Sequence, residues 1–209
     1  GQYGKIDWVE SNNEYWLELD AQLRTDFNIT TGLKSHEIEK YKSKLAMKEY
    51  YRKAGLPCAR CAPVTDLEAG LAFAREAGYP LVVKPDNGVG AVATWKLENE
   101  EDLRRFFQAP PEAPYLMEEY VSGSVTTYDG ICDSKGEVLF AASHVTRNSI
   151  MDMVNKHVPT YYYVDKEVPP DVEAAGKATL KAFGAASRFF HLEFFRLTRA
   201  KAGLGEVGD

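Results

Sequence analysis

A short apolar segment that ends in a lysine and a glycine-rich turn constrains this chain most. Residues 80–83 predict a buried strand, Lys84 follows at its end, and residues 91–97 predict a second strand. Between them, Gly88 and Gly90 allow a tight turn whose N–H groups can approach phosphate oxygens. The segment therefore predicts a β-hairpin at a nucleotide triphosphate site, and the alternative is an ordinary turn beside an exposed lysine.

This hairpin is unlike two common nucleotide-binding motifs. In a P-loop the glycines lead into a helix beside a Gly-Lys-Ser/Thr ending, and the dinucleotide fingerprint also places a helix after its glycines. Here the glycines connect two expected strands. The segment is therefore neither a P-loop nor a Rossmann fingerprint.

Composition excludes several classes of protein. The chain has 209 residues, of which 44% are hydrophobic, which is enough for a core in one domain or two small ones. A net charge of −6 argues against nucleic acid as the main partner. No run approaches the roughly 18 apolar residues of a membrane helix, and the first residues lack the apolar core of a signal peptide. We therefore expect a globular, cytoplasmic protein without a membrane partner.

The cysteines and histidines form no clear metal or redox motif. Three cysteines do not suggest a disulfide framework. Cys58 and Cys61 form a C-x-x-C, but no second ligand pair follows at zinc spacing, and the motif lies in an expected loop rather than at the start of a helix. We interpret the spacing as chance, with redox or metal binding as the alternative.

Periodicity and turn signals predict a chain of mixed helices and strands. Thr65 and Glu68 have the pattern of a capping box at the start of one helix. The expected helices are residues 13–27, 43–54, 65–78, 99–108 and 170–186, and the further expected strands are residues 6–9, 115–120, 126–133, 137–145, 160–164 and 189–197.

Carboxylates at two strands are candidates for ligand contacts. Glu118 and Glu119 lie where a strand enters a turn, and a carboxylate there could accept the amino hydrogens of adenine; the alternative is two solvated acids. Glu193 lies in a strand apolar enough to be buried, where a carboxylate needs a partner or a metal. His191 is on the same face by strand alternation and could be that partner.

These segments together resemble the ATP-grasp superfamily. Lys44, the Lys84 hairpin, the strand end at residues 118–121 and Glu193 follow one another in the order and rough spacing of that family. The chain is most similar to ATP-grasp proteins akin to the carbamoyl phosphate synthase large subunit, through residues 82–90 and residues 191–195.

The resemblance implies an α+β ATP-grasp fold, in which two α/β subdomains hold a nucleotide between them. Residues 1–40 would be the end of a preceding domain with a linker, residues 41–121 the N-terminal subdomain, and residues 122–209 an incomplete C-terminal subdomain that lacks the final strands. The lid hairpin would be residues 81–97.

It also implies roles for individual residues. Lys44 and Lys84 would contact the phosphates of ATP, and Glu118 would take the adenine amino group. Glu193 would be the first carboxylate for Mg²⁺. The mobile lid and the rest of the base-binding strand end would consist of Asp86, Asn87, Gly88, Gly90, Ala91, Glu119, Tyr120 and Val121, of which Glu119 and Val121 would act through their backbone.

The activity that the resemblance implies is that of an ATP-dependent, carbon–nitrogen bond-forming ligase. Such an enzyme activates a carboxylate as an acyl phosphate, which an amine, ammonia or a thiol then attacks. The acceptor would be an unidentified carboxylate or a bicarbonate-like molecule, as in carbamoyl phosphate synthase. Arg147 could bind this anion or the reacting phosphoryl group, or it could be a solvated loop charge. A homodimer is a further expectation.

Two departures from the family pattern modify the expectation. Val125 occupies the place of an acidic residue that contacts ribose in many relatives, and the second metal carboxylate of the family would follow Asp209. We therefore expect nucleotide binding with poor catalysis. The alternatives are a non-catalytic nucleotide-binding or regulatory ATP-grasp module, and an α+β protein without a nucleotide site.

Overall fold

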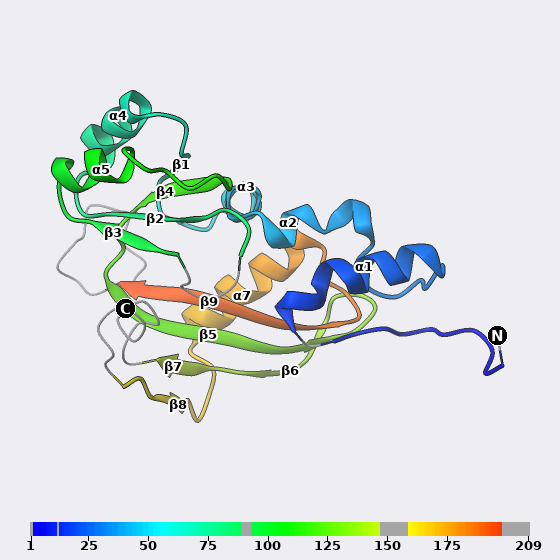
Figure 1. Cartoon of the computed structure of the whole chain (residues 1–209). Helices are drawn as coiled ribbons and strands as arrows, with labels where there is room; N and C mark the ends of the chain where they lie inside the picture. Colours follow the sequence, from blue (N-terminus) through cyan, green and yellow to red (C-terminus); the bar gives the residue numbers. More distant parts are fainter. Residues whose placement is uncertain (1, 12, 89–92, 147–158, 198–209) are drawn as a thin grey trace. The chain divides into compact units, whose positions relative to one another are not determined.

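The computed structural model describes residues 2–11, 13–88, 93–146 and 159–197 (Figure 1). The chain forms two compact units. Unit 1 comprises Gly1–Leu56, Thr127–His144 and Val164–Glu193, and unit 2 comprises Pro57–Thr126, Val145–Tyr163 and Phe194–Asp209. Helices and strands occur in both units, as the predicted α+β class requires. Among the described residues, no helix combines the length and the apolar character that a membrane crossing needs.

Unit 2 contains a four-stranded antiparallel sheet with two helices. The strands follow the order β1-β4-β2-β3, and each neighbouring pair is antiparallel. Helices α4 and α5 lie beside this sheet (Figure 1). The elements are β1 (Cys61–Pro63), α4 (Leu67–Ala77), β2 (Leu81–Pro85), β3 (Trp95–Leu97), α5 (Glu100–Phe106) and β4 (Tyr115–Glu119).

One face of this sheet forms the core of unit 2. Leu81, Val83 and Met117 have no solvent exposure, and they pack in one cluster with Phe73 of α4 and Leu103 of α5. Because successive side chains of a strand point to opposite faces, the residues between them must lie on the other face. The sheet therefore separates an apolar, helix-covered face from a face that carries polar side chains.

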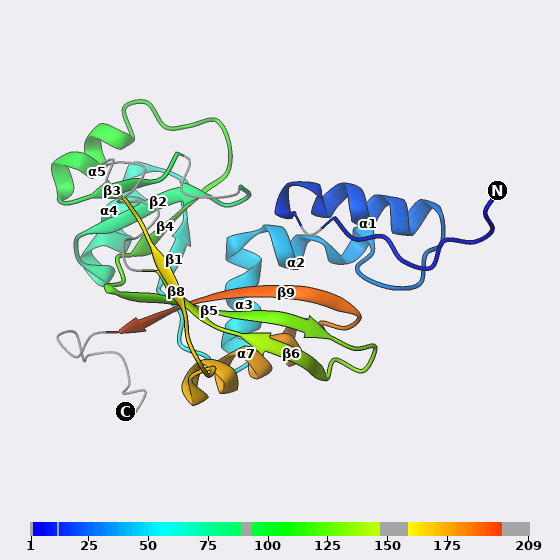
Figure 2. The same cartoon turned by 90° about the horizontal axis from the view of Figure 1, so that it is seen from below.

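The second sheet has five strands. Its order is β6-β5-β7-β8, and β9 also pairs with β5. Strands β5, β6 and β9 run side by side in Figure 2. The strands are β5 (Gly123–Cys132), β6 (Val138–Ala142), β7 (His144–Thr146), β8 (Tyr162–Val164) and β9 (Arg188–Leu197).

The break between β6 and β7 falls in the single strand that was expected at residues 137–145. Both strands pair antiparallel with β5, β6 opposite residues 129–132 and β7 opposite residues 125–126. Ser143 separates them, and its carbonyl oxygen accepts a hydrogen bond from the N–H of Asp165 at 2.9 Å. Strand structure in this region was therefore predicted correctly, but its interruption at Ser143 was not.

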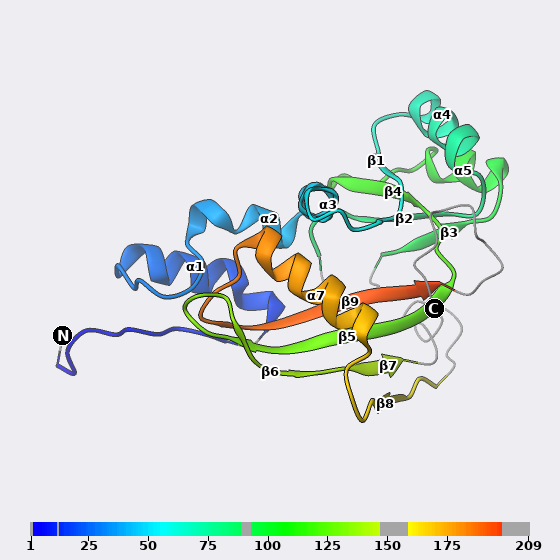
Figure 3. The same ribbon diagram turned by 180° about the vertical axis from the view of Figure 1, so that it is seen from behind.

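Helix α7 (Pro170–Phe183) packs along β5 and β9, which Figure 3 shows from behind. The contact depends on Gly176, because a Cβ atom there would lie 2.1 Å from Cδ1 of Tyr128 on β5. The helix ends at Gly184 in the left-handed conformation, with φ of 64°, where glycine is favoured. Lys40 Nζ and Tyr41 Oη both donate to the carbonyl oxygen of Phe183, at 2.9 and 3.1 Å.

The N-terminal part of unit 1 is helical. Arg24 is only 2% exposed and donates to the carbonyl oxygens of Val9 and Leu33. The strand expected at residues 6–9 is absent from the described segment. The carbonyl oxygen of Val9 accepts hydrogen bonds from the Arg24 guanidinium and not from the N–H of a neighbouring strand. The elements are η1 (Glu14–Trp16), α1 (Leu17–Asp26), η2 (Ser35–Glu37), α2 (Glu39–Lys42) and α3 (Lys44–Lys53).

The start of α4 corrects the predicted capping box. Asp66, not Thr65, is the N-cap, and its side chain accepts a hydrogen bond from the N–H of Ala69 at 2.9 Å. A carboxylate next to the helix N-terminus also interacts favourably with the helix dipole. Most other predicted boundaries differ from the structure by one to three residues, while the types of these elements are as predicted.

Candidate functional site

Two predicted ATP contacts meet on the polar face of the unit 2 sheet. Lys84 Nζ lies 2.5 Å from Glu118 Oε2, and the side chains are 26% and 10% exposed. Val82 is directly opposite Glu118, so Lys84, two residues further along β2, is on the same face and diagonal to it. The structure thus forms a largely buried ion pair from a predicted phosphate contact and a predicted adenine contact.

Lys96 belongs to the same face, and the sequence analysis missed it. It is directly opposite Val82 on β3, so one row across the sheet carries Lys96, Val82 and Glu118. Its Nζ lies 4.4 Å from the ring centroid of Tyr120 and 2.9 Å from Oε1 of Glu98. Alternation of side chains along the two expected strands of the hairpin could have predicted that Lys96 lies on the same face as Lys84.

Glu119 has a different partner from Glu118. Its carboxylate accepts hydrogen bonds from Nε and the backbone N–H of Arg60, at 2.8 and 2.9 Å. Arg60 also donates to the carbonyl oxygens of Glu76 and Ala77 at the end of α4. The side chain of Glu119 therefore has a structural role, because it connects β4 to the end of α4 through Arg60. Its backbone N–H donates to Arg60, which leaves only its carbonyl oxygen for the predicted contact with a base.

Arg60 lies inside the C-x-x-C segment. Cys58 and Cys61 are free thiols of intermediate exposure, and Cys61 begins β1 opposite Glu118. Between the two cysteines lies Arg60, whose contacts with Glu119 and the end of α4 were not predicted from the sequence.

The predicted lid is described only in part. The N–H of Asp86 donates to the carbonyl oxygen of Pro114 at 3.0 Å, and Asn87 and Gly88 follow it after the end of β2. Gly90 and Ala91 lie outside the described residues, as does Arg147. Val121 follows β4 directly after Tyr120, at the predicted end of the base-binding segment.

Lys44 and Glu193 belong to unit 1. Lys44 is the first residue of α3, next to the N-cap Ser43, whose hydroxyl accepts from the N–H of Ala46 at 3.1 Å. Glu193 is on β9, where alternate residues are exposed, and its side chain is 58% exposed. The expectation of a buried Glu193 was therefore wrong, because one face of β9 is exposed, and Phe189 and Phe195 on that face are exposed as well.

Glu193 belongs to a cluster of titratable side chains. His191 Nε2 lies 3.7 Å from Oε1 of Glu193, and His191 Nδ1 lies 2.5 Å from Oδ1 of Asp129. The other carboxylate oxygen of Asp129 accepts from the Thr127 hydroxyl and lies 3.1 Å from His144 Nδ1. His191 thus lies beside Glu193 at ion-pair distance, and the cluster includes three residues, Asp129, Thr127 and His144, that were not predicted from the sequence.

The pKa values in this cluster follow from its contacts. Burial favours a higher pKa for Asp129, but hydrogen bonds from His191 and Thr127 outweigh burial and lower it. The contacts with Asp129 and then Glu193 raise the pKa of His191 to about 10. The imidazole of His191 lowers the pKa of Glu193. At neutral pH the cluster therefore contains an imidazolium between two carboxylates.

Glu193 fits the role of a single carboxylate ligand for magnesium. It is ionised and exposed, and Mg²⁺ is commonly held by one or two carboxylates together with water and substrate phosphates. In the parts of the chain that the structure describes, no three His, Cys, Asp or Glu side chains are grouped to hold a metal ion.

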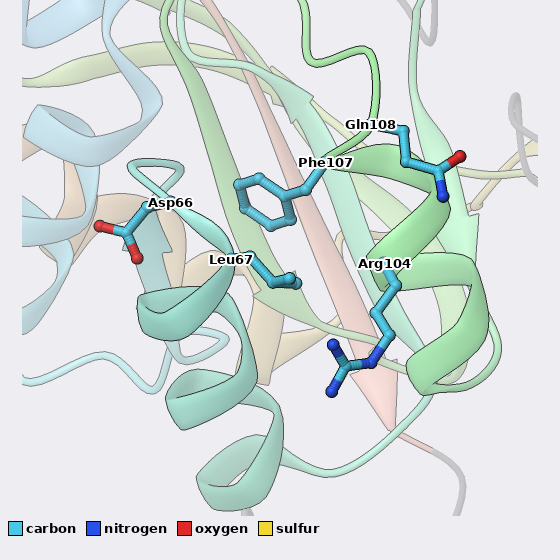
Figure 4. Close-up of a pocket in the computed structure, with 5 residues that line it drawn as sticks. All are labelled: Asp66, Leu67, Arg104, Phe107 and Gln108. Atoms are coloured by element: carbon cyan, nitrogen blue, oxygen red, sulfur yellow. The ribbon is translucent and has the colours of Figure 1, made fainter.

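An open hollow of unit 2 lies between α4 and α5 (Figure 4). Asp66 and Leu67 line it from the start of α4, and Arg104, Phe107 and Gln108 line it from α5 and its end. None of these residues is a predicted ATP contact. Asp66 caps α4, and Arg104 forms an ion pair with Glu100 of the same helix. Both charged side chains that line the hollow therefore have partners within the helices.

The chain is similar in sequence to a known family of domains. Residues 42–143 match the family model described as "Carbamoyl-phosphate synthase L chain, ATP binding domain". A curated relative, the carbamoyl phosphate synthase large chain, C-terminal section, from Methanopyrus kandleri, is 27% identical over 113 residues. This match covers 52% of the chain and 21% of the relative.

Solved structures show the same fold. An L-amino acid ligase from Bacillus licheniformis matches 91% of the chain with a TM-score of 0.68 and 19% identity. The ATP-grasp ligase PsnB, complexed with a minimal precursor, matches 84% of the chain with a TM-score of 0.58 and 21% identity. The chain has the ATP-grasp fold. It spans 45% and 55% of those two solved chains, and its predicted α+β ATP-grasp fold is confirmed.

Proposed function

We propose that the chain binds ATP on the face of the unit 2 sheet that carries Lys84 and Glu118, as the nucleotide-binding part of an ATP-dependent ligase. The observation that carries this proposal is the ion pair between these two side chains. The lysine of this mostly buried pair offers a group for phosphate, and the carboxylate offers one for the adenine amino hydrogens.

The remaining predicted contacts extend this site. Lys44 would contact the phosphates as a second point charge, and the carbonyl oxygen of Glu119 and the backbone of Val121 would contact the base. Residues 86–91 would close over the phosphates, and Arg147 would bind the acceptor anion. A lysine suits such a role because its ammonium group is a compact, strongly charged donor.

Glu193 would hold a magnesium ion on the nucleotide phosphates. When bound, this ion would offset the negative charge that the phosphates carry. His191 lowers the pKa of Glu193 below its ordinary value, which agrees with an ionised oxygen ligand at neutral pH. The protein itself would contribute mainly positioning and electrostatics.

The reaction that we propose is the formation of an acyl phosphate from ATP and a carboxylate or bicarbonate, followed by attack of an amine. Support comes from the carbamoyl phosphate synthase family model and from a neighbour described as an L-amino acid ligase. These two relatives suggest bicarbonate and free amino acids as the first acceptors to try.

Binding can be tested by calorimetric titration with a non-hydrolysable ATP analogue, with and without Mg²⁺. We expect Mg²⁺ to tighten binding. Lys84→Met should weaken binding at least about tenfold, which corresponds to about 1.4 kcal/mol. Because this change removes an ionic partner from the buried carboxylate of Glu118, Lys84→Met with Glu118→Gln serves as a second variant, in which both members of the ion pair are neutral.

Lys177→Met is a matched control, because it removes a lysine from an ion pair with Glu173 on the exposed side of α7. Its affinity should equal that of the unaltered chain. Equal affinities in all three variants would show that the nucleotide does not use the Lys84 and Glu118 face.

Ligase chemistry needs a separate test. The chain is incubated with ATP, Mg²⁺ and hydroxylamine, and with either bicarbonate or a mixture of L-amino acids. An acyl phosphate would react with hydroxylamine to give a hydroxamate and release phosphate, both of which can be measured. Nucleotide binding without hydroxamate or phosphate would instead support the non-catalytic nucleotide-binding module.

A further inference from the structure

The cluster around Asp129 contains more side-chain contacts than a single metal-binding carboxylate, Glu193, requires. Both oxygens of Asp129 are used, Oδ1 by His191 and Oδ2 by Thr127 and His144. Thr127 Oγ1 lies 3.0 Å from His144 Nδ1 and accepts the backbone N–H of His144 at 3.1 Å. The role proposed above for Glu193 uses none of these three contacts, so they call for their own explanation.

The contacts of Asp129 determine how His191 is oriented. His191 Nδ1 lies against Asp129, so its second ring nitrogen, Nε2, is the one that lies near Glu193. An imidazole held at one nitrogen presents the other in a defined direction. The ring of His144 stacks on that of His191, with centroids 6.2 Å apart and planes 23° apart, which further limits rotation of His191.

We propose that Asp129 is a positioning residue, which holds the Glu193 carboxylate through His191 in the orientation that a divalent cation on the nucleotide requires. The inference rests on the proposed function for the identity of that cation. A glutamate with 58% of its side chain exposed would otherwise sample several rotamers, and ordering it in advance removes that cost from metal binding.

The contacts of Asp129 give a second reason for the arrangement. Asp129 Oδ1 lies 2.5 Å from His191 Nδ1, so the ring of His191 is held from the side opposite Glu193 and can stay in place when a cation binds there. Thr127 and His144 in turn hold the second carboxylate oxygen of Asp129, which fixes the orientation of Asp129.

The test uses Asp129→Asn, which keeps the size of the side chain and removes its charge. Calorimetry with a non-hydrolysable ATP analogue gives the factor by which Mn²⁺ or Mg²⁺ tightens binding. We expect this factor to fall about tenfold in Asp129→Asn and in His191→Gln, with metal-free affinity within twofold of the unaltered chain. This factor should be no lower in the double variant than in either single variant, because Asp129 acts on Glu193 through His191.

Asp165→Asn is the matched control, since Asp165 is another unit 1 carboxylate with a hydroxyl partner, Ser143. It should leave the metal factor unchanged. The inference is overturned if Asp129→Asn keeps the full metal factor. It is equally overturned if this variant loses metal-free affinity to the same extent, because Asp129 would then not act through the cation.

A second measurement separates this inference from the proposed function. Without nucleotide or metal, carbon-13 NMR of the Glu193 carboxyl reports on its surroundings. Asp129→Asn should shift this resonance, although Asp129 does not contact Glu193. An unchanged resonance overturns the positioning role even if ATP binds. A shifted resonance in a chain that fails to bind ATP supports positioning and rejects only the proposed function.

Discussion

Lys84 Nζ lies 2.5 Å from Glu118 Oε2, across two neighbouring antiparallel strands of the unit 2 sheet. Each of these side chains is predicted to contact a different part of ATP, and each has the other as an ionic partner. A bound nucleotide would therefore share the pair or replace it. Since a buried charge that loses its ionic partner is costly, changing one member of the pair also affects the other.

The first prediction concerns base selection by Glu118. Glu118→Gln should weaken binding of a non-hydrolysable ATP analogue about tenfold and change binding of the GTP analogue much less, because adenine has an amino group at position 6, where guanine has a carbonyl oxygen that cannot donate to this carboxylate. Calorimetric titration measures both affinities. Glu98→Gln, an acid at the end of the same sheet, is the control and should affect neither. A parallel loss for both nucleotides would argue against an adenine contact.

The second prediction concerns the contact between Arg60 and Glu119. Arg60→Ala should lower the free energy of unfolding by about 1–3 kcal/mol, since it leaves Glu119, 8% exposed, without its cationic partner. Urea denaturation followed by circular dichroism measures this. Arg105→Ala removes an exposed arginine from ion pairs on α5 and should change stability by less than about 0.5 kcal/mol. Equal effects would mean that the Arg60 contact is not structural.

The third prediction concerns Gly176. Gly176→Ala should lower the free energy of unfolding by about 1–3 kcal/mol, because the new methyl group would overlap the Tyr128 ring and force α7 away from β5. Ala174→Ser adds one atom at an exposed position of the same helix and should be close to neutral. Thermal unfolding compares the two. A stable Gly176→Ala variant would show that α7 does not pack this closely on the sheet.

The fourth prediction is a pH dependence of stability due to Tyr41. Burial raises the pKa of Tyr41 to about 12 from the ordinary 10.0. A raised pKa contributes stability that is complete below pH 10 and is lost as the pH rises through about 12. At pH 11 the loss is about 1 kcal/mol.

Tyr41→Phe tests this dependence, because phenylalanine cannot ionise. Urea denaturation at pH 8 and pH 11 gives the change in stability for each protein, and the unaltered chain should lose more than the variant. The comparison within each protein removes the effect of the lost hydrogen bond to Phe183 and of lysines that titrate in the same range. Identical losses would mean that Tyr41 does not titrate differently on folding.

The hairpin and the polar face of unit 2 were predictable because they depend on short-range patterns. Strand alternation places Lys84 and Glu118 on one face once β2 and β4 are recognised. The same rule should have identified Lys96. The helices also followed from local signals, although at α4 two possible caps, Thr65 and Asp66, were adjacent and sequence alone could not rank them.

Contacts between distant residues were not predictable from one sequence. Asp129 and His191 are 62 residues apart, and neither has a local feature that points to the other. Arg60 contacts Glu119, which is 59 residues away, and the C-x-x-C pattern around Arg60 gives no sign of this contact. The exposure of Glu193 was also not predictable from the sequence. An apolar strand with one exposed face can have the same composition as a strand that is buried on both faces.

The most direct test of the account is photolabelling of the chain with 8-azido-ATP, followed by mass spectrometry of the labelled peptides. The account predicts that label is found in residues 81–97 and 115–121, and that excess unmodified ATP prevents it. Label confined to other segments, such as those that line the hollow between α4 and α5, would contradict nucleotide binding at the Lys84 and Glu118 face.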